Sequence, residues 1–224
     1  TWPLLAWLAW RCGINVYLLA LAIGAASFLW NLGSVVAEPE AAFYSPATRA
    51  WELMMGCALA ARENSGAMAP LGRRQANATA AAGILLIAAA WCLVSRESVF
   101  PGAWALLPTL GAVLLLRSGR DAWINRRIFA RQPLVYLGLI SYALYLWHWP
   151  MVLFAISYWG ELSAAQGLAV VVASVIPAWI TYRLVENPLR YSRAVSGSPR
   201  FALSLGGNFT LAGACAGLAL LVTS

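Results

Sequence analysis

Residues 16–36 of the chain read VYLLALAIGAASFLWNLGSVV, a run of 21 positions without a charged side chain. A helix needs about 20 mostly apolar residues to cross the hydrocarbon core of a bilayer, so this run is long enough to cross once. Inside lipid every backbone amide and carbonyl must find a partner, and a helix supplies these partners within one segment. The run therefore predicts a transmembrane helix, and with it the fold class.

The composition supports lipid as the main environment of the chain. Hydrophobic residues make up 62% and charged residues 10%, whereas a soluble domain carries about 25% charged residues. The net charge of +7 could suggest nucleic acid. However, every basic residue is an arginine, and most arginines lie in short loops between apolar runs, which is typical of a topology signal. We therefore expect no nucleic-acid partner.

Other apolar runs predict further crossings. Long ones cover 76–94, 134–159, 167–180 and 202–222, shorter ones cover 51–61 and 103–116 (the latter interrupted by Pro108), and 4–10 is too short to span. The prediction is an all-α, polytopic transmembrane helical bundle of about seven spans, two of them short or weak, plus a partial first one. Residues 1–200 would form one membrane domain, and 201–224 an additional helix.

The loops between these runs alternate in charge, which predicts their sides. Arginine-rich loops fall on one side, which the positive-inside rule makes cytoplasmic, and the other side is mainly acidic. The first set holds Arg11, Arg62, Arg73, Arg74, the segment 117–131, Arg190, Arg193 and Arg200, and the second holds Glu38, Glu40, Glu97 and Glu161 with Arg49 and Arg96.

Residues 43–56, FYSPATRAWELMMG, place ionisable groups at or below the predicted outer surface. Arg49 and Glu52 are three apart, so they share one face if a helix begins near Ala47. Ionisable residues within a membrane segment indicate a functional site. An ion pair that only fixes the helix is an equally weighted alternative.

Residues 141–150, SYALYLWHWP, contain the single histidine of the chain. Ser141, Tyr145, His148 and Val152 fall on one helical stripe. At 1.5 Å per residue His148 lies roughly 21 Å along its span, beyond the midplane toward the outside. Histidine can act as a general base, but no acid shares the stripe. We favour a packed histidine that hydrogen-bonds across the bundle, so that His148→Ala would cost folded yield at least as much as specific activity.

Residues 182–190, YRLVENPLR, lie at the predicted cytoplasmic end of a span. We expect Pro188 to end the helix and Arg183 to pair with Glu186 at spacing three. Anchoring in the lipid headgroups would explain these residues. It would also explain the basic segment 117–131, although the arginines of that segment could instead bind a coenzyme phosphate. The cysteines have no CxxC or histidine spacing, so we expect no metal site.

In this order, residues 43–56, 137–154 (LGLISYALYLWHWPMVLF) and 183–190 (RLVENPLR) resemble the C-terminal half of the acyltransferase 3 family, bacterial membrane O-acyltransferases of cell-surface polysaccharide. The resemblance covers nearly the whole chain. It implies a multi-pass protein of the bacterial inner membrane. It also implies that an acyl group, often acetyl, passes from cytoplasmic acyl-CoA to a hydroxyl of a cell-envelope glycan such as lipopolysaccharide, with no metal.

The resemblance also carries candidate functional residues over to this chain. They match an Arg-x-Trp-Glu motif, an aromatic-histidine motif and a Glu-x-Pro motif, and they are Arg49, Trp51, Glu52, Ser141, Tyr145, His148 and Glu186. The family takes its catalytic histidine from an Arg-x10-His motif on its first span, and this chain begins after that region. We therefore identify no catalytic residue. We expect the missing N-terminal half as a partner, and an incomplete catalytic centre in this chain alone.

Two functions of other classes stay open. Short or broken spans with charges inside the membrane are typical of transporters. However, the segments 47–61 and 103–116 do not occupy corresponding positions in two repeated halves, and solute flux into vesicles would be the deciding observation. The chain could also be the non-catalytic half of a split bundle, which co-purification with a protein carrying the early spans would indicate.

Overall fold

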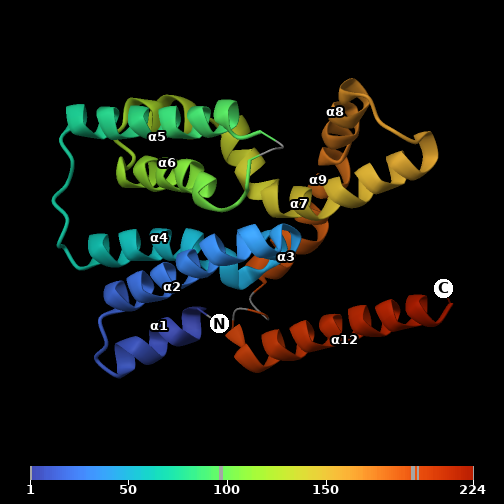
Figure 1. Cartoon of the computed structure of the whole chain (residues 1–224). Helices are drawn as coiled ribbons and strands as arrows, with labels where there is room; N and C mark the ends of the chain where they lie inside the picture. The colour runs from blue at the N-terminus through green and yellow to red at the C-terminus, as the bar shows by residue number, and fades with distance from the viewer. Residues whose placement is uncertain (1, 96–97, 193–194, 196, 224) are drawn as a thin grey trace. The chain divides into compact units, whose positions relative to one another are not determined.

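The computed structural model describes residues 2–95, 98–192, 195 and 197–223, and these consist of helices and turns without a strand (Figure 1). The all-α prediction is confirmed. The elements in chain order are α1 Trp2–Arg11, α2 Val16–Ala37, α3 Pro39–Tyr44, α4 Pro46–Asn64, α5 Arg73–Leu93, a 3-10 turn Ala103–Ala105, α6 Leu106–Arg117, a π-turn Asn125–Phe129, α7 Gln132–Trp159, α8 Ala164–Ala173, α9 Val175–Thr181, a π-turn Tyr182–Glu186, α10 Asn187–Tyr191 and α12 Pro199–Thr223.

Four helical stretches are long and apolar enough to cross a membrane, and they are Val16–Ala37, Arg73–Leu93, Gln132–Trp159 and Ala164–Tyr191. Their large apolar side chains are widely exposed, which suits a lipid environment. The chain is thus a helical membrane protein, and the count of about seven spans stays a prediction.

A shorter apolar helix, Ala103–Arg117, covers the predicted weak span. Its predicted interruption at Pro108 is wrong, because α6 runs through that residue. Pro108 is the third residue of α6, within the first turn, where its missing N–H breaks no bond of the α-helix.

The chain forms two compact units, residues 1–131 and 132–224. The first unit contains the Arg49 motif and the basic segment, and the second contains the His148 and Glu186 motifs. The predicted division after residue 200 stays a prediction.

In the first unit α2 and α4 lie side by side over an apolar core (Figure 1). Asn15 starts α2, since its Oδ1 accepts a hydrogen bond from the N–H of Tyr17 at 3.0 Å. Ala20 and Met54 are buried between the two helices. A Cβ added to Gly24 would lie only 3.2 Å from the Cβ of Met54, so the glycine lets α4 approach closely.

The helices α5 and α6 also pack as a pair (Figure 1), through two facing glycines. A Cβ on Gly83 would lie 2.7 Å from the carbonyl oxygen of Gly111. A Cβ on Gly111 would lie 2.7 Å from both the carbonyl oxygen of Gly83 and Cγ1 of Ile87. Any side chain here would force the helices apart, and such contacts between small residues are a main source of helix association in membranes.

The basic segment between α6 and α7, predicted as a loop, is folded onto the ends of α5 and α6. Asn125 Nδ2 donates to the carbonyl oxygen of Leu115 at 3.1 Å. The backbone N–H of Trp123 donates to Oδ1 of Asn77 in α5 at 2.7 Å. Ala122 is fully buried against the alanines of α5. The arginines of this segment therefore stand on an ordered support.

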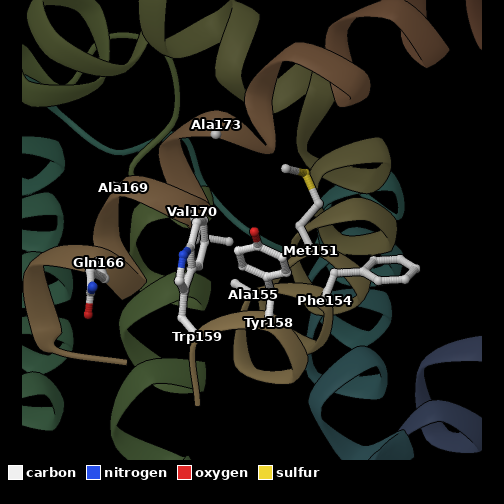
Figure 2. A pocket seen from close by; sticks show the side chains of 9 residues that line it. All are labelled: Met151, Phe154, Ala155, Tyr158, Trp159, Gln166, Ala169, Val170 and Ala173. Atoms are coloured by element: carbon white, nitrogen blue, oxygen red, sulfur yellow. The ribbon is translucent and has the colours of Figure 1, made fainter. Parts of the chain in front are cut away.

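In the second unit α7 packs against α8 and α9. The indole Nε1 of Trp147 donates to Oγ1 of Thr181 at 2.9 Å, and the rings of Tyr136 and Tyr182 meet edge to face. Between α7 and α8 lies a hollow of about 530 Å³, shown in Figure 2. Its walls are Met151, Phe154, Ala155, Tyr158, Trp159, Gln166, Ala169, Val170 and Ala173, so no candidate functional residue lines it.

The expectation that Pro188 ends the preceding helix is wrong. The backbone N–H of Asn187 bonds to the carbonyl oxygen of Tyr182, five residues back, which makes one π-turn. Pro188 then stands at the start of α10, where a missing N–H is tolerated. The helical path continues to Tyr191.

Candidate functional site

The start of α4 is fixed by short polar side chains. Ser45 Oγ accepts a hydrogen bond from the N–H of Ala47 at 3.3 Å, and Pro46 is the first helical residue. Thr48 is buried, and its hydroxyl lies within hydrogen-bond distance of the carbonyl oxygens of Ala42 and Ser45, at 2.8 Å from the latter. The prediction that a helix begins near Ala47 is confirmed to within one residue.

Arg49 and Glu52 form the ion pair that their spacing predicts. Nε and Nη2 of Arg49 donate to the two carboxylate oxygens of Glu52 at 3.2 and 3.1 Å, so the ion pair is bidentate. The guanidinium carbon also lies 5.6 Å from the ring centroid of Phe43. The side chain of Arg49 is 42% exposed and that of Glu52 24%, so the pair has an open side.

Ser27 in α2 holds the turn that carries this pair. Its hydroxyl donates to the carbonyl oxygen of Ala47 and accepts from the N–H of Trp51 at 3.0 Å. These are the two backbone groups that one α-helical bond would join. The position of Arg49 therefore depends on α2 as well as on α4. Ser27 and Thr48 belong to none of the predicted motifs; the signal available for Ser27 was a hydroxyl inside an otherwise apolar run.

Trp51 is the buried member of the Arg-x-Trp-Glu motif. It is 2% exposed, and its ring meets that of Phe28 edge to face with centroids 4.9 Å apart. Its Nε1 is buried and has no hydrogen-bond partner among the described residues. Asn31, one turn beyond Ser27, donates to the carbonyl oxygen of Gly102 at 3.2 Å, and its Oδ1 is likewise unpartnered there.

Within the second unit His148 bonds to its own helix, and the predicted bond across the bundle stays a prediction. Nδ1 lies 2.8 Å from the carbonyl oxygen of Tyr145 and 3.2 Å from that of Leu144. Because a carbonyl can only accept, Nδ1 is the donor in these contacts, and in the neutral imidazole Nε2 is then the acceptor. The rings of Tyr145 and His148 lie 5.8 Å apart, whereas Ser141 donates to the carbonyl oxygen of Gly138 at 2.8 Å. The stripe thus brings tyrosine and histidine together, without the serine.

Glu186 pairs with Arg190 at 2.8 Å, so the predicted pair with Arg183 is wrong. Arg183 instead lies over the ring of Trp179, with its guanidinium carbon 5.4 Å from the centroid. The second carboxylate oxygen of Glu186 is buried and has no partner in the part of the chain that the structure describes. That oxygen remains able to accept a hydrogen bond.

Among the arginines of the basic segment, Arg117 is held on both sides. Its Nη1 lies 3.6 Å from a carboxylate oxygen of Glu63, and its Nη2 donates to the carbonyl oxygen of Ala69 at 2.6 Å. Across 2–95, 98–192 and the other described positions, no ion pair is found for Arg120, Arg126 or Arg127. The segment therefore presents several free guanidinium groups.

Comparison with known proteins identifies the family. The Acyltransferase domain model of the acyltransferase 3 family matches residues 1–183. The peptidoglycan O-acetyltransferase OatA of Listeria monocytogenes is 25% identical over 202 residues, which is 84% of this chain and 32% of that protein. OatA of Staphylococcus aureus, named as an O-acetyltransferase, is 33% identical over 66 residues, 29% of this chain and 11% of that protein.

A third relative is YrhL of Bacillus subtilis, provisionally named as a peptidoglycan O-acetyltransferase, at 25% identity over 68% of this chain and 26% of that protein. The chain spans about a third or less of the length of these relatives. No solved structure matches significantly. The family's domain covers most of the chain and includes the Arg49 and His148 motifs, and the chain belongs to the acyltransferase 3 family.

Proposed function

We propose that the chain is the C-terminal membrane part of an O-acyltransferase, which moves an acyl group, in the first place acetyl, from cytoplasmic acyl-CoA to a hydroxyl of a cell-envelope glycan. The observation that carries the proposal is the bidentate Arg49–Glu52 ion pair, which is partly exposed and lies inside the family's domain. The names of two relatives favour peptidoglycan as the glycan and give no support to lipopolysaccharide.

Arg49 can stabilise the charge that forms during such a transfer. A guanidinium has five N–H donors, and Glu52 uses two of them, so three remain. When the glycan hydroxyl attacks the thioester, a C–O bond forms and negative charge develops on the carbonyl oxygen. Breaking the C–S bond then releases the thiolate of CoA, which takes up the proton that the hydroxyl loses to a base. Fixed donors aimed at the developing charge lower this barrier.

Glu52 has a positioning role in this scheme. By holding Nε and Nη2 it orients the guanidinium and leaves the remaining N–H groups toward the open side. The base is not assigned to a residue of this chain. With Nδ1 as the donor, Nε2 of a neutral His148 could accept a proton, but the sequence favours a packing role for this residue.

The basic segment would bind the donor's phosphates. Arg120, Arg126 and Arg127 stand on an ordered support and have no carboxylate partner among the described residues. Guanidinium groups match phosphate geometry closely. With the arginine-rich loops facing the cytoplasm of the bacterial inner membrane, the donor would be bound where acyl-CoA is made. The glycan would meet the opposite side.

The test is acyl transfer by the full-length gene product in membrane vesicles. Labelled acetyl-CoA is supplied on the cytoplasmic side, and acetylated glycan is measured by mass spectrometry after release from the acceptor. We expect transfer that depends on Arg49 and on the combined Arg120→Ala, Arg126→Ala and Arg127→Ala changes. Solute flux without any acyl transfer would refute the proposal and favour a transporter.

A further inference from the structure

The chain contains three tryptophans that an arginine follows four positions later, and one of these pairs differs from the others. The pairs are Trp7 with Arg11, Trp123 with Arg127, and Trp179 with Arg183. Residues four apart lie on one face of a helix, so the guanidinium can cover the indole. In the first and third pairs it does, with its carbon 5.1 and 5.4 Å from the ring centroid. Among the described residues of the first unit, neither a cation nor an aromatic ring covers Trp123.

Trp123 is held with its side chain outward. Its backbone N–H donates to Oδ1 of Asn77 in α5 at 2.7 Å. The residues on either side of it point inward, since Ala122 is fully buried and Ile124 packs against the same alanine cluster of α5. The indole itself is 51% exposed. A large flat ring on a fixed backbone can stack on a ligand with little loss of conformational entropy.

Arginines lie on both sides of this indole in the chain. Arg120 comes three residues before Trp123, and Arg126 and Arg127 follow it within about one turn. None of the three arginines has an ion pair with a described carboxylate of the first unit. The basic segment contains five arginines and one acidic residue. Its charge therefore favours a ligand with several negative charges.

An exposed aromatic face beside several guanidinium groups matches a purine nucleotide that carries several phosphates. A base can stack on an indole through its π-face, and guanidinium groups bind phosphate oxygens through paired N–H donors. Coenzyme A has this pattern, because its adenosine carries a 3′-phosphate and a 5′-diphosphate. We infer that Trp123 stacks on the adenine of the acyl-CoA donor while the neighbouring arginines bind its phosphates. This inference rests on the proposed function, which assigns only the phosphates.

A phospholipid headgroup is another source of phosphate at this surface, and it predicts different behaviour. Tryptophan and arginine both gather near membrane interfaces. A headgroup contains no purine, so a Trp123 that only anchors the segment in lipid would affect all acyl donors alike. A donor that keeps the thioester but lacks the nucleotide therefore separates the two sources.

The first experiment compares acetyl-CoA with S-acetylpantetheine, which has the thioester but neither the adenosine nor the phosphates. Each donor is supplied to the full-length protein in membrane vesicles, and acetylated glycan is measured at increasing donor concentration. Losing one base stack costs about 5- to 100-fold in affinity. We expect Trp123→Ala to raise the KM for acetyl-CoA by a factor in that range with little change in kcat. Transfer from S-acetylpantetheine should stay unchanged.

Two further variants control for ring chemistry and for the loss of any exposed indole. Trp123→Phe keeps a ring that can stack, so it should retain most of the affinity for acetyl-CoA. Trp91→Ala removes an exposed indole from the apolar part of α5 and should leave both KM values unchanged. The second donor also reports on the fold, because a misfolded protein would lose transfer from both donors.

Direct labelling separates this inference from the proposed function. An adenosine 3′,5′-bisphosphate with a photoreactive azide on its base should label residues 120–127, and unlabelled CoA should compete whereas pantetheine should not. Labelling without any acyl transfer would support the nucleotide site and overturn the catalytic proposal. An unchanged KM for acetyl-CoA in Trp123→Ala, an equal loss with both donors, or labelling competed by anionic phospholipid vesicles and not by CoA would each overturn the adenine assignment.

Discussion

Arg49→Ala removes the guanidinium that holds Glu52, and the exposure of the pair limits how much of the effect can be structural. The two side chains are 42% and 24% exposed, and ion pairs that reach solvent contribute about 0–1 kcal/mol. We therefore expect a loss of stability below about 1 kcal/mol. Removing one donor to a developing oxyanion costs about 100- to 1,000-fold in rate, or about 2.7–4 kcal/mol. The functional loss should exceed the structural one severalfold.

The assay compares acylated glycan per folded molecule in the full-length protein, with thermal unfolding in detergent as the measure of stability. Arg49→Lys keeps the charge but cannot make two parallel bonds to Glu52, so we expect intermediate activity. Glu52→Gln should also reduce activity, because it weakens the bonds that orient Arg49. Normal acylation by Arg49→Ala, or a loss of folded protein as large as the loss of activity, would refute the role that we give the pair.

Gly111→Ala should destabilise the protein by about 1–3 kcal/mol, because its Cβ would lie 2.7 Å from the Gly83 carbonyl oxygen. Gly56→Ala, with open space around it, should stabilise the protein by about 0.5–1 kcal/mol. Equal shifts in melting temperature for the two variants would contradict this packing. Ser27→Ala should cost about 1 kcal/mol and lower acylation although it touches neither Arg49 nor Glu52, and unchanged activity would show that the bridge is dispensable. For His148→Ala the sequence predicts a loss of folded yield at least equal to the loss of activity. A well-folded but inactive His148→Ala protein would contradict that packing role.

The Arg49 motif shows what local sequence can predict. A serine and a proline before an apolar run indicate a helix start, and a helix start fixes which residues share a face. From these two rules the ion pair follows, and the structure confirms it. Both rules concern residues within one turn of each other, so no knowledge of the tertiary fold is needed.

The Glu186 motif shows where the same reasoning fails. Spacing three aligns two residues only while the helix keeps 3.6 residues per turn. The π-turn at 182–186 widens the repeat, so Arg183 and Glu186 no longer share a face, and Glu186 reaches Arg190 instead. Nothing in the local composition distinguishes a π-turn from a regular turn. Pro188, which the sequence predicts to end the helix, follows this widened turn directly and begins the next helical segment.

Contacts between distant segments were also beyond sequence reasoning. Ser27 bonds to residues 20 and 24 positions away, and Asn77 to one 46 positions away. Their polar side chains within or beside apolar runs were visible, but a hydroxyl or amide can bond to its own helix as readily as to a neighbour. The basic segment 117–131 is predicted as a loop because its contacts to α5 and α6, made through Asn77 and Asn125, join residues that are distant in the sequence or outside a regular helix.

The charges that the proposed reaction needs, Arg49 and Glu52, are on α4, whereas the hydroxyl that bridges their turn belongs to Ser27 on α2. Because Ser27 bonds to both backbone groups that a regular α-helical bond would join, a movement of α2 would also move the turn that carries Arg49. The contact at Gly24, where a Cβ would lie 3.2 Å from the Cβ of Met54, limits how large a side chain can stand between the two helices. Residues of α2 outside the Arg-x-Trp-Glu motif therefore help to determine where its guanidinium lies.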